Sequence, residues 1–134
     1  MLHQCTLVIA VTNVKPRLSI VLNNYSIDYL SDWQSDQHGN ILIHFTADLT
    51  PKNIISITVE NLENSNSITL KDIIIDDIRF GLVTFLCTTI NNKQDTQLNT
   101  TGSIDIEICT PIWEWWSNKT NSFNYKEYPL GSLS

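Results

Sequence analysis

The sequence predicts an all-β fold, a jelly-roll-like sandwich of two antiparallel sheets in one domain. Three observations support this prediction. The chain of 134 residues contains 18 Ile and 14 Thr but only 2 Ala, and β-branched side chains favour pleated strands whereas Ala leads the helix scale. Apolar and polar residues alternate with period two along several segments. Clusters of Asn, Asp, Ser and Gly separate these segments at the short spacing typical of sandwiches and barrels.

Five segments show the alternation of a half-buried antiparallel strand. They lie at residues 5–11, 18–22, 41–48, 55–60 and 104–109. The last is the clearest, because its isoleucines alternate with Asp105, Glu107 and Cys109. Polar turn residues occupy positions 23–24, 36–40, 63–66, 91–92 and 99–102. We therefore expect about eight to ten short strands.

The alternation loses its phase within residues 68–80, where three isoleucines follow one another. A β-bulge near residues 71–72 would restore the pattern, because it inserts one extra residue into a strand. This bulge is expected to place Ile74, Ile78 and Phe80 on one face.

The remaining segments complete the predicted organisation. The β-branched run at 82–90 is predicted as a further strand. No window shows the 3.6-residue apolar stripe of a helix, although a single helical turn fits residues 26–33. Alternation stops after Pro111, so we divide the chain into a β-sandwich domain at 1–111 and an aromatic C-terminal arm or surface loop at 112–134, packed on the domain or on a partner.

The balance of charge and apolar residues excludes several classes of protein. With 14 acidic and 8 basic side chains the formal net charge is −6, whereas a nucleic acid or an anionic membrane would need a basic surface. The N-terminal residues lack the charged region and cleavage site of a signal peptide, and the apolar run at 7–11 is too short to span a bilayer. Cys5, Cys87 and Cys109 lie in apolar segments without a CxxC pair. We expect three reduced, buried thiols and folding in a reducing cytoplasm.

The sequence offers no constellation for catalysis. The contexts Gly102-Ser103 and Gly131-Ser132 do not form a nucleophile elbow, and the glycines lie too far apart for a phosphate-binding loop. His3, His38 and His44 are scattered. For His44 we favour a solvent-facing or hydrogen-bonded role over a catalytic one. The chain is therefore predicted not to be an enzyme.

Three aspartates are the candidates for a metal site. Asp72, Asp76 and Asp77 cluster in the sequence, and calcium takes six to eight oxygen ligands. The sequence has no D-x-D-x-D-G loop, however. Solvated residues, or charges that prevent a strand edge from pairing, explain Asp76 and Asp77 equally well. We predict no cofactor and keep calcium only as an alternative.

The aromatic C-terminal segment is the most unusual feature. Three of the four tryptophans lie within residues 113–116, and alternation would place Trp113 and Trp115 on one face and Trp116 on the other. Three interpretations stay open: indoles that stack on sugar rings, anchors of a protein interface, or side chains that close one end of the core. The candidate partner-binding or glycan-binding residues are Trp113, Trp115, Trp116, Tyr125, Tyr128 and Trp33.

Three segments resemble small carbohydrate-binding-module-like β-sandwich proteins encoded by tailed phages of marine cyanobacteria. These are the isoleucine-rich stretches at 54–62 and 68–80, and residues 101–116, where a glycine opens an alternating strand that ends in a Pro and an aromatic cluster. The resemblance covers residues 41–116, about two-thirds of the chain. It implies a jelly-roll-like sandwich and a phage origin. The family's polar loop is shortened here to residues 63–66, so a ligand or calcium site shaped by that loop would be lost.

These observations together predict a non-enzymatic virion protein, an accessory or decoration of capsid, neck, tail or baseplate. It would dock on other phage structural proteins through the aromatic arm and exposed sheet edges, in multiple symmetric copies. The alternative is a carbohydrate-binding module for host surface glycans, with Trp113, Trp115 or Trp33 as stacking platforms. The predicted location is the virion, after synthesis in the cytoplasm of a bacterial host, with neither nucleic acid nor membrane as partner.

Overall fold

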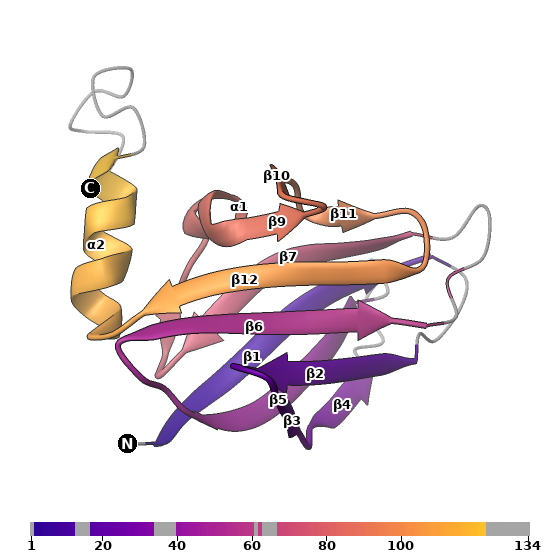
Figure 1. The fold of residues 1–134 in the computed structure, drawn as a ribbon, viewed down its shortest axis with the longest axis horizontal. Helices are drawn as coiled ribbons and strands as arrows, with labels where there is room; N and C mark the ends of the chain where they lie inside the picture. Colours follow the sequence, from indigo (N-terminus) through magenta and orange to yellow (C-terminus); the bar gives the residue numbers. More distant parts are fainter. Residues whose placement is uncertain (1, 13–16, 34–39, 61, 63–66, 123–134) are drawn as a thin grey trace.

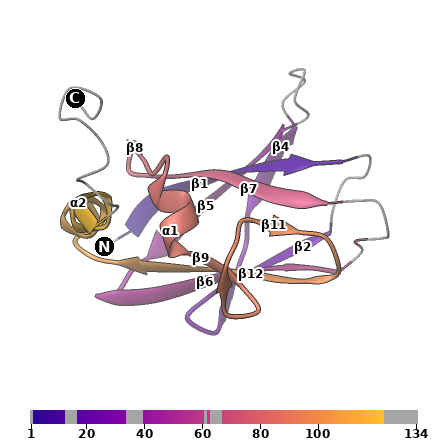
Figure 2. The ribbon, with the colours of Figure 1, turned by 90° about the horizontal axis from the view of Figure 1, so that it is seen from above.

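Two antiparallel sheets pack face to face in the computed structural model, as Figures 1 and 2 show. The model describes residues 2–12, 17–33, 40–60, 62 and 67–122. The prediction of a two-sheet, jelly-roll-like β-sandwich is confirmed.

Each sheet has six strands, and every strand pairing among the described residues is antiparallel. Sheet A runs β11 (Gln97–Leu98), β7 (Ile68–Ile75), β1 (Leu2–Val11), β5 (Asn40–Asp48) and β4 (Leu30–Trp33), and β8 (Ile78–Arg79) pairs with β7. Sheet B runs β10 (Lys93–Gln94), β9 (Thr88–Ile90), β12 (Gly102–Cys109), β6 (Lys52–Val59), β2 (Leu18–Leu22) and β3 (Tyr25–Ile27). The five segments with clear alternation all form strands.

Isoleucines from the two inner faces form much of the core. In β12, Ile104, Ile106 and Ile108 are completely buried, and Ile55 and Ile57 of the neighbouring β6 are buried beside them. Burying one such side chain stabilises the fold by roughly 1.5–3 kcal/mol. Because side chains alternate along a strand, this inner row fixes which residues of β6 and β12 face outward.

The predicted bulge is present in β7. Val8 of β1 pairs with Asp72, but the next residue, Ile9, pairs with Leu70. Lys71 is therefore the extra residue, at the position that the sequence indicated.

The prediction for the residues after the bulge was wrong. Ile73 and Ile75 are completely buried, whereas Ile74 and Ile78 are half-buried. Phe80, only 1% exposed, belongs to the core, but it does not share a face with Ile74. The extra residue lies before Asp72, so Ile73 and Ile75 take the inward positions.

Two-residue turns with left-handed backbone close three hairpins. They consist of Asn23-Asn24, Asp76-Asp77 and Asn91-Asn92, with φ between 49° and 73°. Asn and Asp tolerate this conformation better than other non-glycine residues. The turn predictions at 23–24 and 91–92 are confirmed, and the two aspartates turn out to form the β7–β8 hairpin.

The segment at 82–90 contains a helix that the sequence analysis missed. Residues Val83–Cys87 form the short helix α1, and only Thr88–Ile90 forms a strand. This helix connects β8 of sheet A to β9 of sheet B (Figure 2). The β-branched composition favoured a strand, but the crossover between the sheets requires the chain to bend here. The helical turn expected at 26–33 was also wrong, because β3 and β4 occupy that segment.

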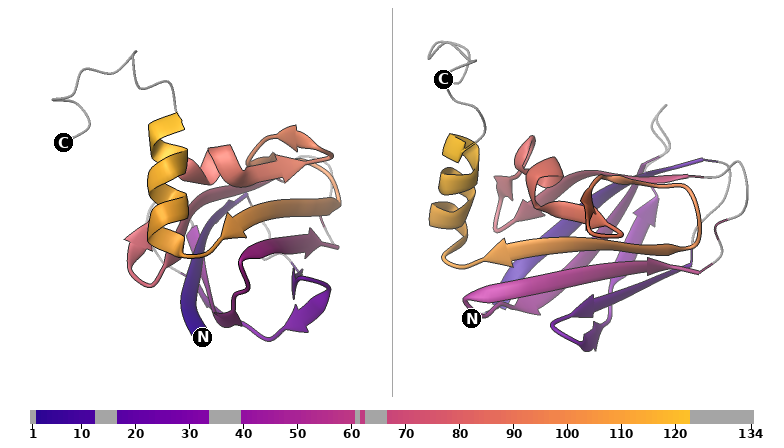
Figure 3. Two further views of the ribbon diagram at one scale, coloured as in Figure 1. Left: turned by 60° about the vertical axis from the view of Figure 1, so that its left-hand side comes forward. Right: turned by 45° about the horizontal axis from the view of Figure 1, so that its top comes forward.

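The C-terminal segment begins with a second helix, α2 (Ile112–Ser122). Ile112, Trp115, Trp116 and Lys119 follow the i, i+3, i+4, i+7 spacing of one helix face, so the expectation of a loop was wrong for these residues. Ile112 is buried and the two indoles are half-buried. Figure 3 shows α2 standing across the end of the sandwich, beside α1 and the end of β12. No helix in the described part of the chain is long and apolar enough to cross a membrane.

Candidate functional site

A row of polar side chains crosses the outer face of sheet B. Ser56 of β6 pairs with Asp105 of β12, which pairs in turn with Thr89 of β9. The Ser56 hydroxyl donates to the Asp105 carboxylate at 2.7 Å. In the next row, the hydroxyls of Thr58 and Ser103 lie 3.0 Å apart. The isoleucines between these positions face the core, so the polar residues are forced outward.

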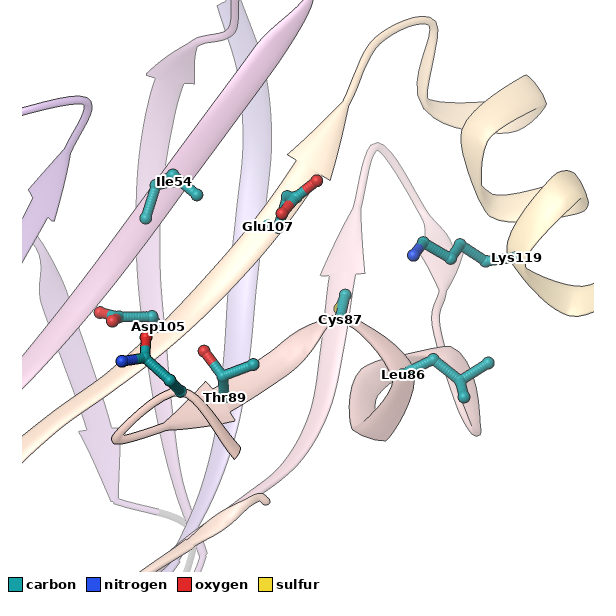
Figure 4. A pocket seen from close by; sticks show the side chains of 8 residues that line it. Ile54, Leu86, Cys87, Thr89, Asp105, Glu107 and Lys119 are labelled. Carbon is teal, nitrogen blue, oxygen red and sulfur yellow. The ribbon is translucent and has the colours of Figure 1, made fainter. Parts of the chain in front are cut away.

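A groove of about 360 Å³ lies at one end of this row. Its lining residues are Ile54, Leu86, Cys87, Thr89, Asn92, Asp105, Glu107 and Lys119. They come from β6, β12, β9, the β9–β10 turn and both helices, as the close-up in Figure 4 shows for the labelled side chains. The volume lies within the range of small-ligand sites.

A second hollow of about 310 Å³ adjoins the first. It is lined by Val21, Asn23, Asn24, Ile54 and Ser56. Ile54 lines both hollows and is 40% exposed. The two hollows together, which we call the sheet B groove, have a mostly polar lining. Val21, Leu86 and Ile54 are its aliphatic side chains, and Ile54 forms the ridge that the two hollows share.

Two carboxylates and one ammonium group set the charge of the sheet B groove. Asp105 and Glu107 are alternate residues of β12 and project from the same face of the sheet, roughly 6.6 Å apart along the strand. Lys119 extends from α2 toward Glu107 in Figure 4, and its ammonium lies 5.9 Å from the centre of the Trp115 ring. The groove thus offers both acceptors and a cationic donor.

The Cys87 thiol, which lines the sheet B groove, is unreactive. Burial raises the pKa of Cys87 to about 12, outweighing the opposing effects of a hydrogen bond with Thr88 and the charge of Lys119. A neutral thiol is a poor nucleophile and a poor metal ligand. Cys5 is likewise buried, as predicted, whereas Cys109 is only half-buried.

The three tryptophans of α2 do not line the sheet B groove. Trp113 is 62% exposed on α2 and stacks on Trp116, with 5.3 Å between ring centroids and 26° between planes. Trp115 instead packs against Phe80. The pairing of Trp113 with Trp115 on one face was therefore wrong, because a helix brings together residues three apart. Of the remaining candidates, Trp33 lies in β4 of sheet A, and Tyr125 and Tyr128 lie outside the described residues.

The first calcium candidate, Asp72, is already bound by protein donors. Its carboxylate accepts hydrogen bonds from Arg79 at 2.9 Å, from the N–H of Ile73 at 2.8 Å and from the N–H of Gly81 at 3.0 Å. The side chain is 11% exposed. These contacts join β7 to the start of the crossover, which is a structural role.

Asp76 and Asp77 do not converge with Asp72 on one point. Asp76 hydrogen-bonds to His3 at 2.5 Å and accepts from the N–H of Gln4 at 2.9 Å. Asp77 is exposed in the hairpin turn. Among the described residues, no group of three or more His, Cys, Asp or Glu side chains is placed to hold a metal ion.

The other histidine of the described chain also has a protein partner. Nδ1 of His44 shares a hydrogen bond of 3.1 Å with the hydroxyl of Thr6, which agrees with the hydrogen-bonded role expected for it. His38 lies outside the described residues.

Sequence reasoning missed most residues of the sheet B groove. It identified Asp105 and Glu107 as outward-facing, but gave no role to Thr89, Asn92 or Lys119. One signal was available: serine, threonine and acidic residues occupy most of the outward positions of β6 and β12. Only the structure shows the register that joins those strands and the helix that carries Lys119.

Comparisons with known proteins support the fold. No family model and no curated protein matches the chain in sequence. A solved structure of vCBM60 in complex with galactobiose is similar, with a TM-score of 0.53 and 12% sequence identity, over 77% of this chain and 96% of that one. Another vCBM60 structure is similar as well, with a TM-score of 0.52 and 12% sequence identity, over 78% of this chain and 89% of that one. It comes from work on the circular permutation that links two families of calcium-dependent carbohydrate-binding modules. The chain therefore has the fold of carbohydrate-binding modules.

Proposed function

We propose that this protein is a non-catalytic carbohydrate-binding module and that the sheet B groove holds the glycan. The observation that supports this proposal best is the groove itself, which lies over four strands of a sandwich of this fold and has a mostly polar lining. The similar vCBM60 structure holds galactobiose. Glycan binding was the alternative drawn from the sequence, and the fold favours it over docking on phage proteins.

The groove residues suit the hydroxyl groups of a neutral sugar. The carboxylates of Asp105 and Glu107 accept hydrogen bonds from hydroxyls, and such charge-assisted bonds contribute about 1.5–3 kcal/mol each. Asn92 both donates and accepts, and Lys119 donates. An anionic sugar would bring its charge against two carboxylates, so we propose a neutral glycan.

Ile54 would provide the apolar contact that a sugar ring needs on its C–H face. It is exposed between the two hollows and faces away from the core. A chain of two or more sugar units would cover this ridge and place hydroxyls in both hollows. No aromatic side chain is among the described residues that line the groove, so the ridge replaces a stacking platform.

The carboxylate pair suits binding better than hydrolysis. Glycoside hydrolysis needs carboxyl groups on opposite sides of the scissile bond. Asp105 and Glu107 project side by side from one strand. The pair would therefore contact the same side of a bound sugar.

Calorimetry of the full chain against a panel of neutral oligosaccharides that includes galactobiose tests the proposal. We expect binding that weakens about tenfold in Asp105→Ala and in Ile54→Ser, because each removes one contact to the sugar. Glu60→Gln, an exposed acidic residue at the end of β6, is the control and should bind normally. Binding to no sugar of the panel, or equal binding by Asp105→Ala, would contradict the proposal.

Docking on a protein partner is the second candidate function. The observation that favours it is Trp113, which is exposed over most of its surface and stacked on Trp116. Tryptophan is enriched among the residues that dominate protein interfaces. The proposal that such a partner belongs to a virion rests on the sequence resemblance alone.

A further inference from the structure

The sheet B groove provides few ligands for calcium, although calcium-dependent modules share this fold. Calcium takes six to eight oxygen ligands. Among the described residues, the side chains that offer oxygen ligands in the first hollow, the one of about 360 Å³, are Thr89, Asn92, Asp105 and Glu107. One of the Asp105 oxygens already accepts the Ser56 hydroxyl at 2.7 Å.

Lys119 adds a positive charge inside the same hollow. Its side chain reaches from α2 into the lining, and its ammonium packs over the Trp115 ring. Trp115 is itself held against Phe80, so the position of the ammonium is supported by the core. A divalent cation beside Asp105 and Glu107 would be repelled by this charge.

We infer that the sheet B groove binds its ligand without calcium, and that the Lys119 ammonium is the resident cation that balances Asp105 and Glu107. The inference rests on the proposed function of the groove. It places this chain apart from the calcium-dependent modules of the same fold. In this arrangement Lys119 donates directly to a sugar hydroxyl, and the two carboxylates accept from others.

Calorimetric titration of the full chain with calcium chloride alone tests the inference. The wild-type chain should show no saturable binding in the groove up to about 10 mM calcium, roughly tenfold above the dissociation constants of about 1 mM at the weak end of calcium sites in proteins. Lys119→Glu removes the ammonium and adds a third carboxylate, so calcium affinity should rise at least tenfold. Asp105→Asn in the same chain should abolish this gain.

Lys71→Glu is the matched control, because it makes the same charge change on an exposed residue of sheet A. It should gain no affinity. Calcium binding by the wild type that Asp105→Asn removes would overturn the inference, and so would a Lys119→Glu chain without any gain. Saturable binding that Asp105→Asn leaves unchanged would place the ion elsewhere and support a calcium-free groove.

The calcium titration needs no sugar, so its outcome is independent of the glycan screen. Failure of every sugar to bind would count against the proposed function alone. Once a sugar binds, its affinity should be the same within about twofold in calcium and in EDTA. A sugar that binds only in calcium would uphold the proposed function and overturn the inference.

Discussion

The outer faces of the two sheets differ, although their inner faces are alike. On sheet A, both polar and aliphatic residues point outward, and the aliphatic ones include the half-buried Val8, Leu42 and Ile74. On sheet B, the outward positions of β6 and β12 are mostly serine, threonine and acidic residues, with Ile54 as the aliphatic exception, and both helices and a turn border them to form a groove. The inner isoleucines determine that a sandwich forms, and the outer residues distinguish the face that we propose binds the glycan.

Two aspartates illustrate the difference between the faces. Asp72 of sheet A is 8% exposed and accepts hydrogen bonds from one guanidinium and two backbone N–H groups. Asp105 of sheet B is half-buried and accepts from one hydroxyl. The first carboxylate stabilises the fold, whereas the second has oxygen lone pairs left for a ligand.

The largest expected effect is therefore the loss of stability in Asp72→Ala. It leaves the N–H groups of Ile73 and Gly81 without their acceptor and removes the partner of Arg79. We expect a fall of about 2–4 kcal/mol in the free energy of unfolding. Urea denaturation measures this change.

The same measurement on Asp105→Ala is the matched comparison. We expect a change within about 0.5 kcal/mol, because the residue is only half-buried and only the Ser56 contact is lost. Equal destabilisation by the two variants would remove the distinction between the faces.

Period-two patterns made the sandwich predictable from the sequence. Alternation identified the long strands, and paired asparagines identified two hairpin turns. The bulge at Lys71 was found because the isoleucine pattern lost its phase there. These features are local, so the sequence of a single strand or turn is enough to predict them.

The helices and the groove were less predictable because they depend on tertiary contacts. In α2, the consecutive indoles of Trp115 and Trp116 obscured the spacing from Ile112 to Lys119. The groove needs β6, β9 and β12 in register and then a lysine from a distant helix. No single segment of the sequence contains that juxtaposition.

A smaller effect on stability is expected from the pair of His3 and Asp76, which fixes the start of β1 on sheet A. Burial raises the pKa of Asp76, but hydrogen bonds from His3 and Gln4, and the charge of His3, outweigh it, so the pKa lies below its ordinary value. A lowered pKa means that the ionised carboxylate stabilises the fold above the ordinary value of about 3.9. This contribution is lost as the pH falls through the lower, folded value.

Asp76→Asn tests that contribution, because Asn also tolerates the left-handed turn at this position. Near neutral pH we expect a loss of no more than about 1 kcal/mol, since the Asp76 side chain is 43% exposed and solvent screens the pair. The difference from wild type should shrink below about pH 4. Urea denaturation at several pH values measures it, and a difference that grows toward low pH would contradict the assignment.

A change in stability as small as that of Asp105→Ala is expected from Trp113→Ala, on a helix that belongs to neither sheet. The ring is mostly exposed and contributes mainly its stacking on Trp116. We expect a loss of about 0.5 kcal/mol and unchanged sugar binding, because Trp113 does not line the groove.

Trp116→Ala is the contrasting variant on the same helix. It should destabilise the chain more, since Trp116 is half-buried and its indole N–H donates to the carbonyl oxygen of Phe80 at 3.3 Å. If α2 docks on a partner, Trp113→Ala should abolish capture of that partner by the intact chain while leaving the melting temperature nearly unchanged. Partner capture that survives Trp113→Ala would remove the docking role of α2 and leave the sheet B groove as the functional surface.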